Sequence, residues 1–177
     1  PRFTSELFAW GESLMGVLIA FVIIFTFVVR LFGVDGMSMY PTLEDRSIML
    51  VSNLGYHPEK GDIVVLRKDG FYSDQPIVKR VIATGGQTVD LQDGKVVVDG
   101  QALDEDYTTG MSWPLSVQAP GAQVSYPYTV PDGCVWVMGD NRENSADSRY
   151  FGPVDRSDLI AVALVRYWPL NRIGAID

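Results

Sequence analysis

Two patterns of hydrophobic residues divide the chain into a short first part and a longer second part. From Leu14 to Val34 the residues are almost all apolar, and Arg30 is the only charged one. As an α-helix this stretch would be about 31 Å long at ~1.5 Å per residue, which matches a hydrocarbon core of about 30 Å. The pattern predicts one transmembrane helix over residues 13–34, preceded by a juxtamembrane segment over residues 1–12.

A cleaved signal peptide and a buried core helix are the alternatives for this apolar run. A signal peptide has a shorter apolar region that ends in a cleavage site of small residues. This run leads instead into Gly33-Val34-Asp35-Gly36-Met37, a poor cleavage site, so a retained anchor is favoured. Arg2 and Arg30 lie at opposite ends of the run, so charge alone does not indicate an orientation.

Beyond the apolar run, short stretches rich in valine and isoleucine alternate with turn dipeptides. None has the 3.6-residue period of a long helix, and Asp93-Gly94 between two of them is a strong β-hairpin signal. We predict a mainly β domain over residues 35–177, folded as antiparallel sheets or an open barrel, with an irregular insertion around residues 103–130. The predicted strands are Ser47–Ser52, Asp62–Arg67, Ile77–Ala83, Thr88–Leu91, Lys95–Val98, Val135–Met138 and Leu159–Tyr167.

Charge and composition exclude several kinds of site. The formal net charge is −8, which argues against nucleic-acid binding and against simple electrostatic adhesion to anionic lipid. Cys134 is the only cysteine and His57 the only histidine, so this chain has neither the ligands of a zinc site nor an internal disulfide. We therefore expect no metal and no cofactor. Nothing in the composition indicates an oligomeric state.

Ser38, next to the apolar run, is a candidate nucleophile. Serine is a poor nucleophile until a neighbouring base takes its proton, and histidine is the usual base. His57 lies in the turn-like stretch Gly55-Tyr56-His57-Pro58-Glu59, where a solvated histidine is the better interpretation. The search for a base therefore turns to lysine.

Lys79 lies within the apolar strand over residues 76–83, whereas the other three lysines border turns. Alternation along a strand places Lys79 and Arg80 on opposite faces. Burial would lower the pKa of Lys79 from ~10.4 towards the ~7–8 that suits a base near neutral pH. An edge-strand lysine that deters aggregation is the alternative, and the segment alone does not decide between them.

These segments, with the polar run at residues 139–149, resemble the bacterial type I signal peptidases, which are membrane-bound Ser/Lys proteases. Four blocks match in order, and the match is weakest over residues 103–130. The base position holds lysine, as in the bacterial branch, and not the histidine of the endoplasmic-reticulum branch. The blocks are Ser38-Met39-Tyr40-Pro41-Thr42-Leu43, Lys60-Gly61-Asp62-Ile63-Val64-Val65, Val78-Lys79-Arg80-Val81, and Gly139-Asp140-Asn141 through Ser145-Ala146-Asp147-Ser148-Arg149.

The resemblance implies that Ser38 is the nucleophile, Lys79 the general base and Ser145 a hydroxyl that orients Lys79. Some family members carry a second serine two residues before the nucleophile, which helps to stabilise the oxyanion. Gly36 stands there in this chain, as in Gram-positive forms, so the oxyanion hole would rely on the Ser38 backbone N–H. Two implied ion pairs hold the polar run against the lysine strand: Arg80 with Asp140, and Arg149 with Asp147.

The implied activity is removal of N-terminal signal peptides from secreted preproteins after small-x-small sites such as Ala-x-Ala. The implied partners are those signal peptides and the lipid bilayer. The implied location is the cell membrane, with one span and an extracytoplasmic catalytic domain. Shallow pockets would select small residues, and the peptide would dock extended beside the strands. The candidate pocket walls are Met39, Leu43, Ile77 and Val78.

Two other classes of protein fit parts of the pattern. A self-cleaving repressor-type Ser/Lys protease shares the dyad, but the apolar anchor and the lack of a DNA-binding module disfavour it. A membrane-anchored β domain that binds partners without catalysis shares the anchor, but the combination of Ser38 and Lys79 argues against it. Labelling by a serine-acylating inhibitor distinguishes a catalytic domain from a binding one.

Overall fold

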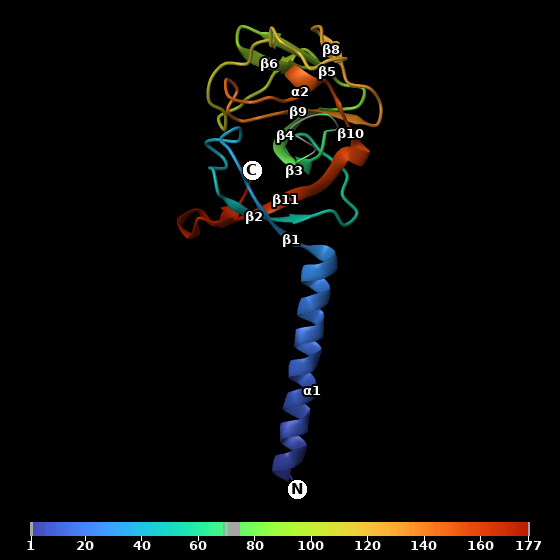
Figure 1. Cartoon of the computed structure of the whole chain (residues 1–177), viewed down its shortest axis with the longest axis vertical. Helices are drawn as coiled ribbons and strands as arrows, with labels where there is room; N and C mark the ends of the chain where they lie inside the picture. The colour runs from blue at the N-terminus through green and yellow to red at the C-terminus, as the bar shows by residue number, and fades with distance from the viewer. Residues whose placement is uncertain (1, 69, 71–74, 177) are drawn as a thin grey trace.

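The computed structural model describes residues 2–68, 70 and 75–176. One long helix, α1, projects from a β domain that holds all the strands of the described residues (Figure 1). The helical elements are α1 (Arg2–Ile23), the π-helical turn η1 (Ile24–Val28), α2 (Ser148–Phe151) and the 3-10 turns η3 (Arg156–Asp158) and η4 (Leu170–Arg172). The strands are β1 (Arg30–Gly33), β2 (Ile48–Ser52), β3 (Ile63–Leu66), β4 (Ile77–Thr84), β5 (Thr88–Gln92), β6 (Lys95–Val98), β7 (Gln101–Ala102), β8 (Tyr128–Thr129), β9 (Cys134–Met138), β10 (Val154–Asp155), β11 (Leu159–Trp168) and β12 (Gly174–Ala175).

The N-terminal helix ends earlier than the apolar pattern predicts. The sequence predicted helix to residue 34, but the helical backbone stops at Val28 and Arg30–Gly33 form strand β1. Strand β1 pairs antiparallel with β2, with Arg30 opposite Val51. A short apolar run suits a helix or a strand equally well, so tertiary pairing decides between them. No helix within the described residues has both the length and the apolar character that a membrane span requires.

The β domain consists of two antiparallel sheets, in agreement with the predicted mainly β fold. The larger sheet has the strand order β1-β2-β11-β3-β4-β9-β10, with β12 paired to β11, and the smaller has the order β7-β6-β5-β8. The predicted hairpin at Asp93-Gly94 joins β5 to β6. Both of its turn residues have positive φ, 51° and 77°, as a two-residue hairpin turn of this kind requires.

Strand β4 lies in the middle of the larger sheet, between β3 and β9. Its residues Val78 to Ala83 are all buried, because both faces of the strand pack against core. Val78 contributes to a cluster that also contains Met39 and Leu43, whereas Val81 contributes to a second cluster. A polar side chain on this strand is therefore removed from water on whichever face it lies.

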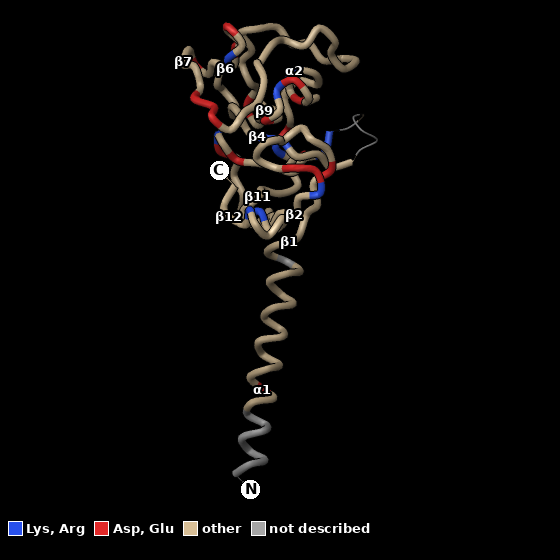
Figure 2. The backbone as a smooth tube through the Cα atoms, turned by 90° about the vertical axis from the view of Figure 1, so that its left-hand side faces the viewer, with Lys and Arg blue, Asp and Glu red and all other residues tan. Residues whose placement is uncertain are grey.

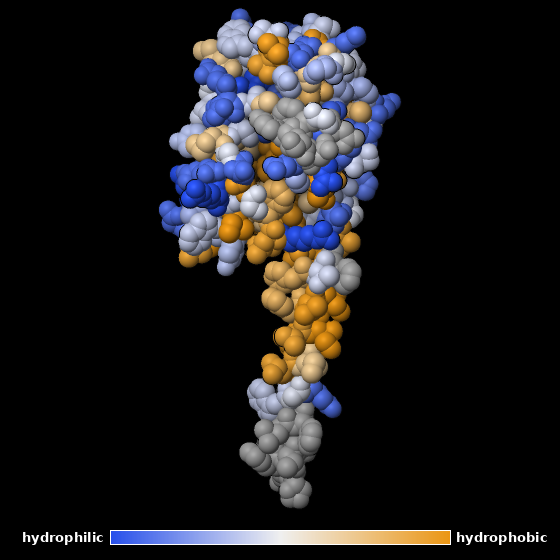
Figure 3. Space-filling model, viewed as in Figure 1, coloured by the Kyte–Doolittle hydropathy of each residue, from blue (hydrophilic) through white to orange (hydrophobic). Residues whose placement is uncertain are grey.

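Charged residues concentrate in the β domain, and Glu12 is the only charged residue between Trp10 and Val29 (Figure 2). On the face shown in Figure 3, apolar side chains cover the part of α1 nearer the β domain and continue onto the base of that domain. Trp10, Leu14, Val17 and Phe21 are among the α1 side chains that are more than half exposed. Such a contiguous apolar surface marks a site of contact with a partner or a lipid phase.

The segment between β7 and β8 has no helix or strand at any of its residues, all of which are described. A single bridge joins Thr109 to Asn141, so this irregular segment touches the polar run that follows β9. Side chains from the segment reach two buried arginines, Arg80 and Arg142. The insertion is therefore part of the surroundings of the lysine strand.

Candidate active site

Ser38 and Lys79 lie together although 41 residues separate them in the chain. Ser38 is half-buried in the turn over residues 36–43 that follows β1, called the serine turn below. Lys79 is buried in β4. The Lys79 Nζ lies 2.8 Å from the Ser38 Oγ and also donates to the Val78 carbonyl at 2.9 Å. The hydroxyl and the amine are thus within the distance that direct proton transfer requires.

Burial lowers the pKa of Lys79 to about 8 from its ordinary value of 10.5. Desolvation is the main cause, because a buried ammonium loses its hydration. The carboxylates of Asp147 and Asp140 favour the charged form and partly oppose this effect, while the Arg149 guanidinium reinforces it. A lysine in this environment has a neutral fraction near neutral pH large enough to act as a base.

A cleft of about 690 Å³ opens beside the pair and is lined by both Ser38 and Lys79. Ile77 and Val78 also line it, as predicted for the pocket walls. Met39 and Leu43 do not; their side chains are buried in the core cluster behind the serine turn. The turn directs both side chains into the core, so within the described residues they lie behind the cleft and not on its surface.

Ser145 lines the same cleft but does not form the predicted hydrogen bond to Lys79. Its Oγ is buried and forms no well-aligned hydrogen bond within the described residues, but the hydroxyl is close enough to Asp147 to help lower the pKa of that carboxyl. The close packing of Gly139 is the physical reason for its placement: a Cβ added at Gly139 would lie 2.3 Å from the Ser145 Oγ and 2.5 Å from the Ser38 carbonyl oxygen. Glycine at 139 thus lets the polar run over residues 139–149, called the polar loop below, pack closely against the serine turn.

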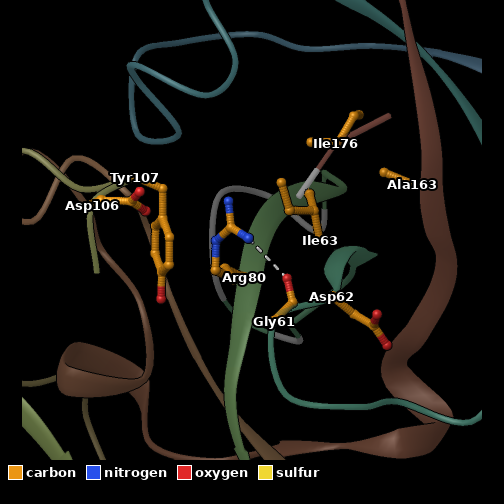
Figure 4. A pocket seen from close by; sticks show the side chains of 8 residues that line it. All are labelled: Gly61, Asp62, Ile63, Arg80, Asp106, Tyr107, Ala163 and Ile176. Atoms are coloured by element: carbon orange, nitrogen blue, oxygen red, sulfur yellow. Dashed lines mark hydrogen bonds between the residues drawn. The ribbon is translucent and has the colours of Figure 1, made fainter. Parts of the chain in front are cut away.

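Arg80 and Asp140 form one of the two implied ion pairs. The Arg80 Nε and Nη2 donate to the two Asp140 carboxylate oxygens at 3.0 and 2.9 Å, and both side chains are buried. Thr42, within the serine turn, also donates to Asp140. Arg80 lines a separate cavity of about 420 Å³ (Figure 4), so it lies on the other side of β4 from Lys79, as alternation predicts.

Arg149 and Asp147 form the second implied ion pair. The Arg149 Nε and Nη2 donate to the Asp147 carboxylate at 2.9 Å each, and the Gly139 N–H donates to it at 3.0 Å. Burial opposes ionisation of Asp147, but these donors hold its pKa below the usual value. Gly139 begins the polar loop and Asp147 lies near its end, so the bond between them holds the two ends of the loop together.

The loop also holds the backbone of the serine turn directly. The Asn141 N–H donates to the Ser38 carbonyl at 3.0 Å, and the Asn141 Nδ2 donates to the Met37 carbonyl at 3.1 Å. These bonds fix the main chain on both sides of the Ser38 N–H. The orientation of the nucleophile thus depends on the conformation of residues 139–142.

Gly36 occupies the position where some family members carry a serine. Its φ is +94°, a conformation that glycine adopts readily and L side chains rarely do. Its N–H donates to the Asp45 Oδ1 at 2.8 Å. The backbone of this turn thus accounts for the missing hydroxyl, since a serine at position 36 would be strained.

Four residues that hold the polar loop were not singled out from the sequence. No sequence signal separates three of them from the solvated residues of a loop rich in proline and glycine, and the fourth was one charge among several in the polar run. The four residues are Glu105, Tyr107, Ser112 and Arg142.

Within the described part of the chain no group of three or more histidine, cysteine or acidic side chains could hold a metal ion.

Comparisons with known proteins point to one family for this chain. A family model described as "Signal peptidase, peptidase S26" matches residues 7–168. Signal peptidase I of Leptolyngbya laminosa is 36% identical over 160 residues, covering 85% of this chain and 74% of that protein. Signal peptidase IB of Staphylococcus aureus is 32% identical over 187 residues, covering 94% of this chain and 92% of that protein. A crystal structure of a signal peptidase I from Enterococcus faecalis aligns with a TM-score of 0.49 and 30% identity over 60% of this chain and 97% of that one. The chain therefore belongs to the family of type I signal peptidases, peptidase S26.

Proposed function

We propose that this chain is a membrane-anchored serine endopeptidase that removes signal peptides by means of a Ser38–Lys79 dyad. The observation that carries the proposal is the 2.8 Å contact between the Ser38 Oγ and the Lys79 Nζ. Burial of Lys79, which lowers its pKa to about 8, supports its assignment as the base. The cleft that both residues line supplies room for a peptide.

In the proposed reaction neutral Lys79 takes the proton of the Ser38 hydroxyl as the Oγ attacks the scissile carbonyl carbon. The carbonyl oxygen becomes an oxyanion, which the Ser38 N–H stabilises. The Lys79 ammonium then returns a proton to the leaving amine, and an acyl-enzyme on Ser38 forms. Lys79 next takes a proton from water, whose hydroxide attacks the ester carbonyl carbon. The C–O bond to Ser38 then breaks, the Lys79 ammonium returns its proton to the departing Ser38 Oγ, and the carboxylate product is released.

The shape of the cleft supports binding of an extended peptide. Three stretches of chain line it: residues 32–38 from the end of β1 onward, residues 75–79 leading into β4, and residues 143–146 of the polar loop. An extended substrate would lie between them and add its backbone to strand edges. Ile77 and Val78 then limit the size of the side chain next to the scissile bond, which favours small-x-small sites.

A membrane anchor fits the exposed apolar surface of α1. The large apolar side chains between Leu14 and Phe25 are exposed to solvent, and full burial of a side chain of this size in an apolar phase is favourable by about 1.5–3 kcal/mol. Because only η1 and Val29 separate α1 from β1, and the turn with Ser38 follows β1, Ser38 lies a few residues along the chain from the point where the anchor meets the domain. Confining enzyme and signal peptide to one membrane surface raises their effective concentration. We assign the β domain to the extracytoplasmic side.

Ser145→Ala is expected to lower kcat about tenfold, the equivalent of one hydrogen bond of ~1.4 kcal/mol. Neutral Lys79 has two N–H groups, and one is bonded to the Val78 carbonyl. The buried Ser145 Oγ in the same cleft is the acceptor proposed for the other. Steady-state kinetics on an Ala-x-Ala peptide measure the effect. Ser125→Ala, at an exposed position, is the control; equal rates for the two variants would remove Ser145 from the site.

A serine-acylating inhibitor tests the proposed nucleophile directly. Intact-mass analysis should find one adduct on the wild-type chain, located on Ser38 by peptide mapping, and none on Ser38→Ala. Labelling should weaken below pH 8, since protonated Lys79 cannot accept the hydroxyl proton. An adduct on another serine, or wild-type cleavage that the inhibitor leaves untouched, would contradict the assignment.

A further inference from the structure

Residues 105–112 lie in the irregular segment between β7 and β8. Their side chains bind Arg142, a buried arginine of the polar loop. The Arg142 Nη1 and Nη2 donate to the two Glu105 carboxylate oxygens. The Arg142 Nη1 also donates to the Ser112 Oγ at 2.6 Å. The Arg142 side chain is 1% exposed and that of Glu105 9% exposed. This is a charge pair withdrawn from water, not a surface ion pair of little consequence.

The Arg142 side chain also binds its own loop. Its Nε donates to the Gly139 carbonyl at 2.9 Å, which closes the turn over residues 139–142 from within. Its own carbonyl accepts from the Arg149 Nη2 at 2.7 Å. The same turn presents the Asn141 N–H to the Ser38 carbonyl. The conformation of the Arg142 side chain is therefore linked, through one short turn, to the backbone of the nucleophile.

The same segment reaches the lysine strand on its other side. The Tyr107 ring covers the Arg80 guanidinium, 4.0 Å from the ring centroid (Figure 4), and the Tyr107 hydroxyl donates to the Glu105 Oε1. The backbone of Thr109 exchanges hydrogen bonds with the loop: its N–H donates to the Asp140 carbonyl, and its carbonyl accepts from the Arg142 N–H. Residues 105–112 thus contact the neighbour of Lys79 and the loop that holds Ser38.

We propose that residues 105–112 form a catalytic clasp and that Glu105 is a positioning residue for the Ser38–Lys79 dyad, acting through Arg142. The proposal rests on the proposed function and extends it to a segment outside the four matching blocks. Glu105 touches neither member of the dyad. It fixes the Arg142 side chain, which fixes the turn at residues 139–142, and that turn sets the main chain of Ser38. A displacement of a reacting group by about 1 Å costs on the order of 10²-fold in rate.

The clasp is tested by steady-state kinetics of the full-length chain on an Ala-x-Ala peptide. We expect Glu105→Ala to lower kcat on the order of 10²-fold, with KM within about twofold of wild type, because Glu105 lies outside the cleft. The acid limb of the pH profile should stay in place, since the clasp does not alter the burial of Lys79. Asp104→Asn removes one negative charge at the adjacent exposed position and should leave kcat within about twofold.

A double-mutant cycle with Arg142→Met separates positioning from general loosening of the fold. If Glu105 acts through Arg142, Glu105→Ala should change kcat by less than about twofold in the Arg142→Met background. A full additional loss there would overturn the proposal. So would wild-type kcat in Glu105→Ala, or a loss of kcat that equals the loss of folded protein at the assay temperature, measured by circular dichroism.

Glu105→Gln decides the matter if Glu105→Ala does not fold. It keeps the shape of the side chain and one acceptor oxygen while removing the charge, and we expect kcat to fall about tenfold with the fold intact; unchanged kcat would overturn the proposal. Separate measurements test whether the Ser38–Lys79 dyad itself is assigned correctly. Wild-type cleavage and Ser38 labelling report on the dyad, whereas the clasp is judged on ratios between variants that all retain Ser38 and Lys79.

Discussion

Ser38→Ala and Lys79→Ala should each lower the rate of cleavage of an Ala-x-Ala precursor on the order of 10³-fold or more. The first removes the attacking oxygen, and the second removes the group 2.8 Å away that accepts its proton. When two residues act together in one catalytic step, removing either one abolishes nearly all of the rate enhancement that the pair provides. The double variant should therefore be hardly slower than either single variant.

The measurement is the initial rate of conversion of a radiolabelled or fluorescent precursor, followed by gel electrophoresis. Lys60→Ala and Ser125→Ala change the same residue types at exposed positions and should cleave at the wild-type rate. Circular dichroism checks that the two inactive variants fold. Turnover by either of them within tenfold of wild type would refute the Ser38–Lys79 assignment.

The pH dependence of kcat/KM should show an acid limb near pH 8, set by Lys79. Burial lowers its pKa to about 8, and only the neutral amine can accept the Ser38 proton. Below that pH the rate should fall about tenfold per unit. A rate that stays level from pH 9 to pH 5 would exclude a lysine base.

The same shift makes Lys79 a cost to stability. Its pKa is lower in the folded chain, about 8, than in the unfolded chain, 10.5. Between these values the unfolded chain binds more protons, so the free energy of unfolding rises with pH from about 8 to about 10.5. Below pH 8 the full penalty applies, and 2.5 units correspond to ~3 kcal/mol.

Lys79→Met should accordingly raise the free energy of unfolding by up to ~3 kcal/mol at pH 7, while abolishing cleavage. It should also flatten the rise in stability above pH 8. Denaturant unfolding at several pH values measures both effects. Lys60→Met, at an exposed lysine, should change neither. If Lys79→Met were less stable than wild type at pH 7, burial would not be the source of the lowered pKa.

Local pattern predicted much of the site. The apolar strand around Lys79 left a buried amine and an edge-strand lysine open, and the structure buries the side chain. Alternation predicted that Arg80 would lie on the other face. The partners of the charged residues were implied by resemblance, and both ion pairs are present in the structure. These features depend on residues adjacent in the chain, or on blocks of sequence that match a family in order.

Three predictions depended on the tertiary fold and were wrong or incomplete. The helix stops short of residue 34, because Arg30–Gly33 find a partner in β2. Met39 and Leu43 are buried in the core cluster and do not line the cleft. Ser145 lies in the cleft without a bond to Lys79. Each outcome depends on which part of the fold a side chain packs against. The hydrophobic pattern indicates that a residue is buried but does not identify its neighbours.

The sequence by itself determined the chemistry available to this protein: one serine beside an apolar run, one lysine within an apolar strand and almost no histidine. Only the tertiary structure decided how those groups are held. The Ser38–Lys79 contact closes a loop of 41 residues, and Glu105 meets Arg142 across 37. Contacts between residues so far apart are set by strand pairing and core packing, because nothing in the local sequence of either partner specifies the other.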